Sequence, residues 1–125
     1  MSPKCISESE IELSILNYLA RTGVGFFWKN VSAGYFDGTK WRKQASPFAI
    51  RGVPDILGYL YSTGRMVALE VKTKTGRLRP DQETFLKKAQ KHHVVCAVVR
   101  SSWEAHLVLL EAGEACSAPT GELAT

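Results

Sequence analysis

Two apolar runs separated by a short polar break constrain the fold of this 125-residue chain more than any other feature. The runs 56–61 and 66–71 each have the length of a strand, and the break at 62–65 contains the turn-forming residues Ser, Thr and Gly. The pattern predicts a β-hairpin. Successive side chains of a strand point to opposite faces, so Glu70 and Lys72 share one face and leave the other face apolar.

Asp55 stands directly before the first of these strands and offers a second carboxylate. A register that pairs the start of the first strand with the end of the second brings Asp55, Glu70 and Lys72 into a small volume. Mg²⁺ prefers carboxylate oxygens and usually takes one or two of them, together with water and substrate phosphate. A lysine beside the ion can orient or deprotonate an attacking water. The trio suits phosphodiester hydrolysis, although Glu-Val-Lys alone also fits a solvated strand.

Four short motifs at these spacings resemble the PD-(D/E)XK nuclease superfamily and, within it, the virus-type replication-repair nuclease (VRR-NUC) domain. The motifs are Gly52–Asp55, Glu70–Lys72, Gly76–Leu78 and Asp81–Gln82. The similarity extends from residue 6 to residue 101. This small module stands alone in phages and bacteria and also ends a eukaryotic DNA repair nuclease. The resemblance implies a restriction-endonuclease-like fold and a DNA hydrolase that depends on Mg²⁺ or Mn²⁺.

The expected roles of the site residues also come from this resemblance. In that family the Asp and the Glu bind the metal ion, the backbone carbonyl between Glu and Lys adds a third ligand, and the Lys is catalytic. The resemblance therefore implies metal ligands at Asp55, Glu70 and the Val71 carbonyl, and a catalytic Lys72. Gln82 is the polar residue that the following helix is expected to bring to this catalytic set.

A helix expected from Ser7 to about Arg21 can supply one further carboxylate. Ser7 followed three residues later by an acid is a capping-box signature, and acids in a first turn have an ordinary structural role there. PD-(D/E)XK nucleases often draw one acid from this helix, and VRR-NUC domains resemble Glu-x-x-Ile-Gln at this point, where this chain has Glu12 in place of Gln. Glu8 and Glu12 share one helical face. We expect Glu8 to contribute, with Glu12 as the second choice.

The other apolar patterns predict the remaining elements. A strand follows the helix stop at Gly23, a helix runs from Pro80 to about His92, a fully apolar strand covers 94–99, and a last helix covers 103–111. The order helix, three strands, helix, strand, helix gives an α/β fold, a mixed sheet flanked by helices. We expect one domain, with a core over about 6–112 and a flexible tail at 113–125.

Two groups of basic residues flank the expected site, in a chain of net charge +4. The segment 32–51 is polar and shows no clear period, as functional or mobile loops do. Its side chains can stack on unpaired bases or hold a DNA backbone, or its aromatic residues can anchor the segment to the core or to a second subunit. The residues expected to bind DNA are Lys40, Trp41, Arg42 and Lys43 in this segment, and Lys74, Arg77 and Arg79 after the hairpin.

Cysteine usage and hydropathy indicate the cellular compartment in which the protein is expected. The three cysteines are an odd number without Cys-x-x-Cys spacing, no signal-type apolar core follows the start, and no apolar run approaches the ~20 residues that span a bilayer. We therefore expect a cytoplasmic protein of a bacterium or a phage-infected cell.

The expected substrate depends on the resemblance. Standalone VRR-NUC proteins resemble archaeal Holliday junction resolvases, which act as two-fold dimers because two symmetric strands must be nicked. A homodimer that nicks four-way DNA junctions is the first expectation. The alternatives are a flap or general DNA endonuclease of the same fold, and a nucleic-acid-binding module of a larger assembly that does not turn over.

Overall fold

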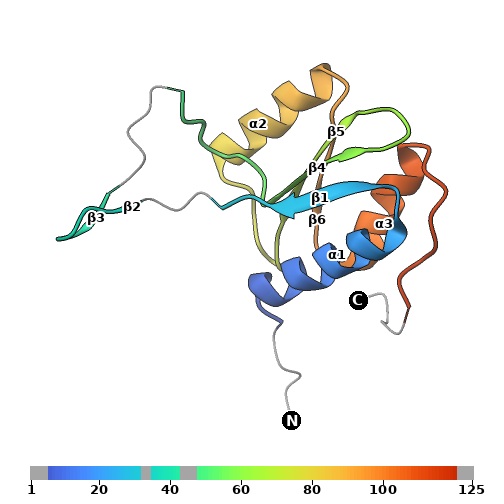
Figure 1. Ribbon diagram of the computed structural model, residues 1–125, viewed down its shortest axis with the longest axis horizontal. Coiled ribbons are helices and arrows are strands. Elements are labelled where there is room, and N and C mark those ends of the chain that lie inside the picture. Colours follow the sequence, from blue (N-terminus) through green and yellow to red (C-terminus); the bar gives the residue numbers. More distant parts are fainter. Residues whose placement is uncertain (1–5, 32–34, 43–47, 121–125) are drawn as a thin grey trace, which may run out of the picture.

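The computed structural model describes residues 6–31, 35–42 and 48–120. The elements in order are α1 (Glu8–Thr22), β1 (Gly25–Lys29), β2 (Tyr35–Phe36), β3 (Trp41–Arg42), β4 (Ile56–Leu60), β5 (Met66–Val71), α2 (Pro80–Lys91), β6 (Val95–Val99) and α3 (Ser102–Glu111). Apart from the small β2–β3 hairpin, this is the predicted order, and the α/β fold class is confirmed (Figure 1).

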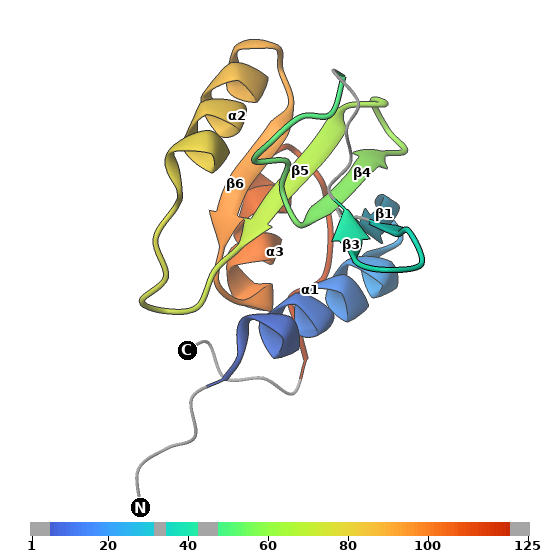
Figure 2. The same ribbon diagram turned by 90° about the vertical axis from the view of Figure 1, so that its left-hand side faces the viewer.

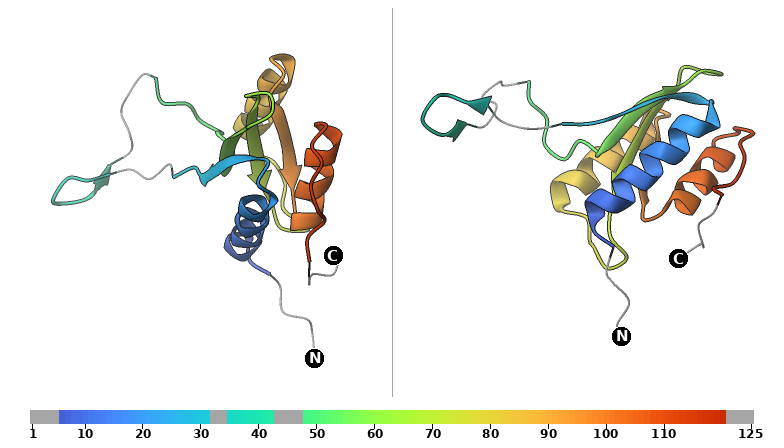
Figure 3. Two further views of the ribbon diagram at one scale, coloured as in Figure 1. Left: turned by 45° about the vertical axis from the view of Figure 1, so that its right-hand side comes forward. Right: turned by 60° about the horizontal axis from the view of Figure 1, so that its bottom comes forward.

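The central sheet is mixed, as the sequence predicted. Its strands lie in the order β1-β4-β5-β6; β4 runs antiparallel to both β1 and β5, and β6 runs parallel to β5. A crossover helix, α2, joins the two parallel strands, because parallel neighbours need a long connection. Figure 2 shows α2 on one face of the sheet, and the second panel of Figure 3 shows α1 and α3 on the other.

The hydrophobic core lies between the sheet and the pair α1 and α3. Val67, Leu69 and Val71 on β5 point into it, as the alternation predicted, and meet Ile15 and Leu19 of α1 there. The opposite face of β5 is also buried, since every residue from Val67 to Val71 has little exposure. Because both faces of β5 are buried, Glu70 does not lie on the solvated face of a surface strand.

Both ends of α1 have the local signals that the sequence predicted. The Ser7 hydroxyl accepts a hydrogen bond from the Glu10 N–H at 3.2 Å, and Gly23 ends the helix with a φ of 68°. None of the helices in the described ranges is both long and apolar enough to cross a membrane.

The segment 32–51, expected to have no regular structure, contains the two-stranded hairpin β2–β3. The Asp37 carboxylate closes its turn by accepting hydrogen bonds from the N–H groups of Thr39 and Lys40, at 2.9 and 3.0 Å. Gly38 provides the positive φ of 102° that this turn needs. These hydrogen bonds, together with Arg42, hold the pKa of Asp37 well below its usual range. Figure 1 shows the hairpin standing away from the sheet.

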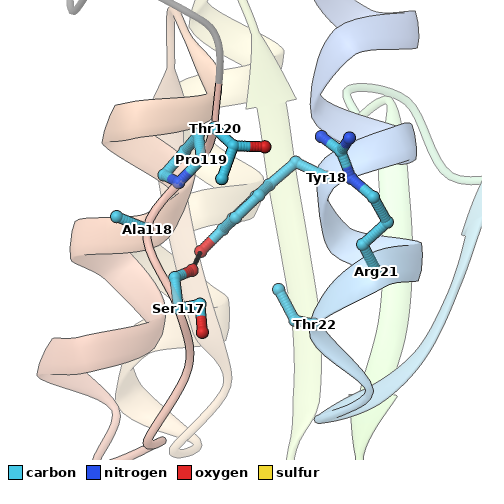
Figure 4. A pocket seen from close by; sticks show the side chains of 7 residues that line it. All are labelled: Tyr18, Arg21, Thr22, Ser117, Ala118, Pro119 and Thr120. Atoms are coloured by element: carbon cyan, nitrogen blue, oxygen red, sulfur yellow. Dashed lines mark hydrogen bonds between the residues drawn. The ribbon is translucent and has the colours of Figure 1, made fainter.

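Residues 113–120, which we expected to begin a flexible tail, lie against α1 and α3. The Tyr18 hydroxyl donates to the Ser117 carbonyl at 2.8 Å and lies 2.8 Å from Nδ1 of His106, and Pro119 is buried (Figure 4). A cavity of about 170 Å³ remains between this segment and α1. Its lining contains none of the residues expected to act on DNA.

Candidate active site

The β4–β5 register brings the two predicted acids together. Ile56 pairs with Leu69, which places Asp55 opposite Glu70 at the end of the hairpin. Asp55 is oriented by the backbone, because its Oδ2 accepts a hydrogen bond from the Val71 N–H at 2.9 Å. Lys72 completes the group, with its Nζ 3.9 Å from Oε1 of Glu70. The structure thus brings together the three side chains that the sequence singled out.

Glu70 is the most deeply buried member of this group, with 1% of its surface exposed. Its Oε1 accepts a hydrogen bond from Nε2 of Gln82 at 2.8 Å, but its Oε2 has no hydrogen-bond partner among the described residues. Burial raises the pKa of Glu70 to about 8, the neighbouring Asp55 carboxyl adds to the increase, and Lys72 opposes it. Without a further cation, Glu70 therefore tends to keep its proton near neutral pH.

Gln82 reaches this site from the first turn of α2, as predicted. Its Oε1 accepts from the Arg79 N–H at 2.9 Å, which satisfies one of the free N–H groups at the helix start. Its Nε2 is then left to donate to Glu70. One amide therefore joins the start of α2 to the acid on β5, and Gln82 is itself buried.

The glycine of the Gly-Val-Pro-Asp motif explains how α2 and the segment before Asp55 come so close. Gly52 has a φ of 76°, and a Cβ at this position would lie 2.3 Å from the Asp81 carbonyl oxygen. Only a residue without a side chain allows this approach of two backbones. Gly52 is therefore a positioning residue, which the sequence motif included without indicating its role.

The first helix brings both candidate acids near the site, and it buries Glu12 while it leaves Glu8 exposed. Glu12 is 8% exposed, and its Oε1 has no hydrogen-bond partner in the described ranges, while its Oε2 lies 3.7 Å from Nζ of Lys29. Burial raises the pKa of Glu12, Lys29 lowers it, and the nearby Asp55 charge raises it further. Glu8 is exposed. Burial thus favours Glu12 as the helix-borne acid, whereas the charge of Glu8, the first choice from the sequence, acts on Glu70 itself and raises its pKa.

The basic residues expected to bind DNA belong to two separate segments of the chain. Lys74, Arg77 and Arg79 are exposed on the loop that joins β5 to α2 and follows Lys72. Lys40, Trp41 and Arg42 belong to the β2–β3 hairpin, where Arg42 pairs with Asp37, and Lys43 lies outside the described residues.

Arg100 fixes the loop that carries the first basic group, and sequence reasoning missed it. Its Nη1 donates to the Gly76 carbonyl at 2.9 Å and to the Thr73 carbonyl. Nothing in the local pattern distinguishes this arginine from an ordinary surface residue, because its partners lie more than twenty residues away in the chain.

The donor set fits a hard divalent cation that keeps part of its water shell. Within the described part of the chain, no three Asp, Glu, His or Cys side chains are gathered closely enough to hold an ion by themselves. Asp55 and Glu70 do provide two carboxyl groups, and Oε2 of Glu70 is a buried oxygen without a hydrogen-bond partner among the described residues. A site of this kind suits Mg²⁺ or Mn²⁺, with a backbone carbonyl, water and phosphate as further ligands.

Comparison with known families links the middle of the chain to one nuclease domain family. The family model of the VRR-NUC domain matches residues 47–103, which extend from just before Gly52 to the start of α3. The matched segment contains Asp55, Glu70, Lys72 and Gln82 and leaves α1 outside. No curated protein matches the chain.

Proposed function

We propose that this chain, whose residues 47–103 belong to the VRR-NUC family, is a metal-dependent endonuclease that acts on branched DNA. A VRR-NUC domain is a nuclease domain of the PD-(D/E)XK type, and such nucleases generally use divalent metal ions. The observation that carries the proposal is the buried cluster at the end of the β4–β5 hairpin. There Asp55, Glu70 and Lys72 converge, and one oxygen of Glu70 has no hydrogen-bond partner among the described residues.

Each side chain of the cluster has a distinct proposed role. Asp55, Glu70 and the Val71 carbonyl would hold Mg²⁺ or Mn²⁺, and Glu12 would assist them, with Glu8 as the alternative. When bound, such an ion would lower the pKa of an attacking water and offset negative charge on the phosphate. The Lys72 ammonium, held beside Glu70, orients the attacking water and offsets negative charge at phosphorus. Gln82 keeps the Glu70 carboxylate in position through its hydrogen bond.

The basic residues are proposed to hold the DNA backbone. Lys74, Arg77 and Arg79 project from the loop that follows the catalytic lysine, so they can contact phosphates next to the scissile bond. Contacts of this type release counterions, and binding that depends on them weakens as salt rises. The hairpin group Lys40, Trp41, Arg42 and Lys43 is proposed to contact DNA farther from the site.

The preferred substrate is a four-way DNA junction, nicked symmetrically by a homodimer in the cytoplasm during DNA repair. A flap or general endonuclease of the same fold is the nearest alternative. Both rest on the same buried acids, and they differ only in the DNA geometry that the dimer accepts. A non-catalytic binding module is the alternative of a different class.

Cleavage assays on labelled four-way, flap and linear duplex DNA, each with Mg²⁺, Mn²⁺ or EDTA, test the proposal. We expect paired nicks in the four-way junction that require a metal ion, and no product in EDTA. Asp55→Asn and Glu70→Gln should abolish the nicks. Glu83→Gln and Lys87→Ala, which alter an exposed ion pair on α2, are the matched controls and should cut normally.

Three results would contradict parts of this proposal. Equal cutting of linear duplex would count against selectivity for junctions. DNA binding without any metal-dependent product would favour the binding module. Wild-type cleavage by the Asp55 or Glu70 variant would remove these acids from the mechanism altogether.

A further inference from the structure

The outer edge of β1 is available for pairing. In the described part of the chain, β1 has β4 on one side and no strand on the other. The Tyr61 N–H donates to the Val24 carbonyl and the Asn30 N–H to the Asp55 carbonyl, at 3.0 and 2.7 Å. Because alternate residues of an antiparallel strand bond to alternate sides, the backbone groups of Gly25, Phe27 and Lys29 point outward. A free edge of this kind is a template for another strand.

An exposed group of large apolar side chains continues from this edge across β4, on the face opposite α1. We call Phe26, Trp28, Tyr59, Tyr61 and Met66 the edge patch; they are 51, 42, 44, 60 and 40% exposed. Ring centroids lie 5.6 Å apart for Phe26 and Trp28, and 6.0 Å apart for Phe26 and Tyr59. Four aromatic side chains of ~200 Å² each, about half exposed, leave roughly 400 Å² of contiguous aromatic surface. A patch of this size commonly marks an interaction site.

The chemistry of the edge patch favours a protein partner over nucleic acid. Its members are aromatic residues and one Met, and neither β4 nor the edge patch itself contains a charged side chain. Lys29, the one charged residue of β1, points to the other face and lies 3.7 Å from Glu12. Nucleic-acid surfaces need free cations, whereas the centre of a protein interface is aromatic and depleted of charge.

We propose that a second copy of this chain docks on the edge patch, with its own β1 antiparallel to the first about a two-fold axis at Phe27. In this register Phe27 faces the partner's Phe27, and Phe26 faces the partner's Trp28, so aromatic side chains meet on the open face. The contact is self-complementary, as a two-fold interface requires. The inference specifies the partner surface of the homodimer in the proposed function and rests on that function only for its biological purpose.

The arrangement joins two four-stranded sheets into one and places both edge patches on the same side. A stable interface needs ~800 Å² from each partner, so the edge patch provides about half, and the strand edge with its flanks must provide the rest. The two-fold axis then places both sites on one side of the joined sheet. They lie beyond opposite ends of the paired β1 strands, because Asp55 bonds to Asn30 just past the end of β1. Two sites related in this way suit two symmetric nicks.

The molecular mass in solution, measured by light scattering in EDTA without DNA, tests the interface independently of cleavage. Twice the chain mass of 13.8 kDa is expected for the wild type. Phe26→Lys combined with Trp28→Lys should give the mass of one chain, with an unchanged circular dichroism spectrum. Leu107→Lys, at a 58% exposed apolar residue of α3, is the matched control and should remain a dimer.

Engineered cysteines test the register and serve if the lysine variant fails to fold. Opposite residues of a non-hydrogen-bonded antiparallel pair have Cα atoms about 4.5 Å apart, which allows a disulfide. Phe26→Cys combined with Trp28→Cys should therefore form covalent dimers on oxidation. Each single variant should not, because its new cysteine faces an aromatic residue of the partner, and the native thiols are the same in all three proteins.

The outcomes separate this inference from the proposed function. The interface is overturned if the wild type has the mass of one chain. It is also overturned if the lysine variant remains a dimer and the double cysteine variant fails to cross-link. The wild type could instead have the mass of one chain and bind single-stranded DNA. If the same lysine substitutions abolish that binding, the edge patch is a nucleic-acid-binding surface. A dimer that cuts no DNA leaves the interface standing and overturns the nuclease proposal alone.

Discussion

Replacing Glu70 by Gln should stabilise the metal-free protein at pH 8. Burial and Asp55 raise the pKa of Glu70 from 4.5 to about 8, so the folded state holds a proton that the unfolded state releases. Between these two values the folded state binds more protons, and the free energy of unfolding must fall as pH rises. At about 1.4 kcal/mol per pKa unit, the loss from this one group has an upper limit of about 5 kcal/mol.

The glutamine variant should avoid this loss because it has nothing to ionise. Its Oε1 can still accept from Gln82, and its amide can donate toward the Asp55 carboxylate, where the native Oε2 has no partner in the described ranges. The assay is thermal unfolding in EDTA from pH 5 to pH 8. We expect the midpoint of the wild type to fall across this range and that of Glu70→Gln to change less.

Controls separate the charge of Glu70 from other titrating groups. Glu83→Gln removes a carboxylate that is 53% exposed and should leave the wild-type pH profile unchanged. Glu12, whose pKa is also raised by burial, is still present in Glu70→Gln, so the unfolding midpoint of this variant should still fall with pH, but less steeply. If Glu70→Gln unfolds at a lower temperature than the wild type at pH 8, or if the two profiles run parallel, the argument from buried charge is refuted.

Three further substitutions test the parts that support the site. Gly52→Ala should lower the free energy of unfolding by ~2–4 kcal/mol in urea titrations, because a positive φ and contact with the Asp81 carbonyl both oppose a methyl group. Gly64 has a similar φ but open space where a Cβ would lie, so Gly64→Ala should lower the free energy of unfolding by only ~1 kcal/mol. Gln82→Ala should cost ~1–3 kcal/mol through two lost hydrogen bonds and should slow cleavage, whereas unchanged cleavage would limit Gln82 to a structural role. Lys72→Ala should remove turnover while DNA binding in EDTA persists, and normal cleavage rates would exclude this lysine from the mechanism.

The parts of this protein that sequence could predict are those determined by neighbouring residues. Alternation along 66–71 and the breaker residues at 62–65 determine the hairpin, and the hairpin register then brings Asp55 opposite Glu70. The ends of α1 followed from Ser7 and Gly23, because both act within one turn of the helix. In these cases the interaction that decides the structure is local.

Features that depend on packing between distant segments could not be predicted in the same way. Glu8 and Glu12 share a helical face, and only the packing of Ile15 and Leu19 against the sheet decides which acid is buried. Arg100 bonds to carbonyls more than twenty residues away. The β2–β3 hairpin had a local signal in its Asp-Gly turn, but strands of two residues are too short to show a period.

The choice between Glu12 and Glu8 can be settled by the stability that a metal ion adds. A ligand that binds only the folded state raises the unfolding temperature, and the increase grows with the logarithm of its affinity, so Mn²⁺ should stabilise the wild type. Glu12→Gln removes a buried carboxylate oxygen without a partner among the described residues and close to Asp55, and should weaken this stabilisation. Glu8→Gln changes an exposed acid on the same helical face and should weaken it less. Equal effects, or a larger effect at Glu8, would show that burial on α1 does not select the acid, and would return the assignment to the first choice made from the sequence.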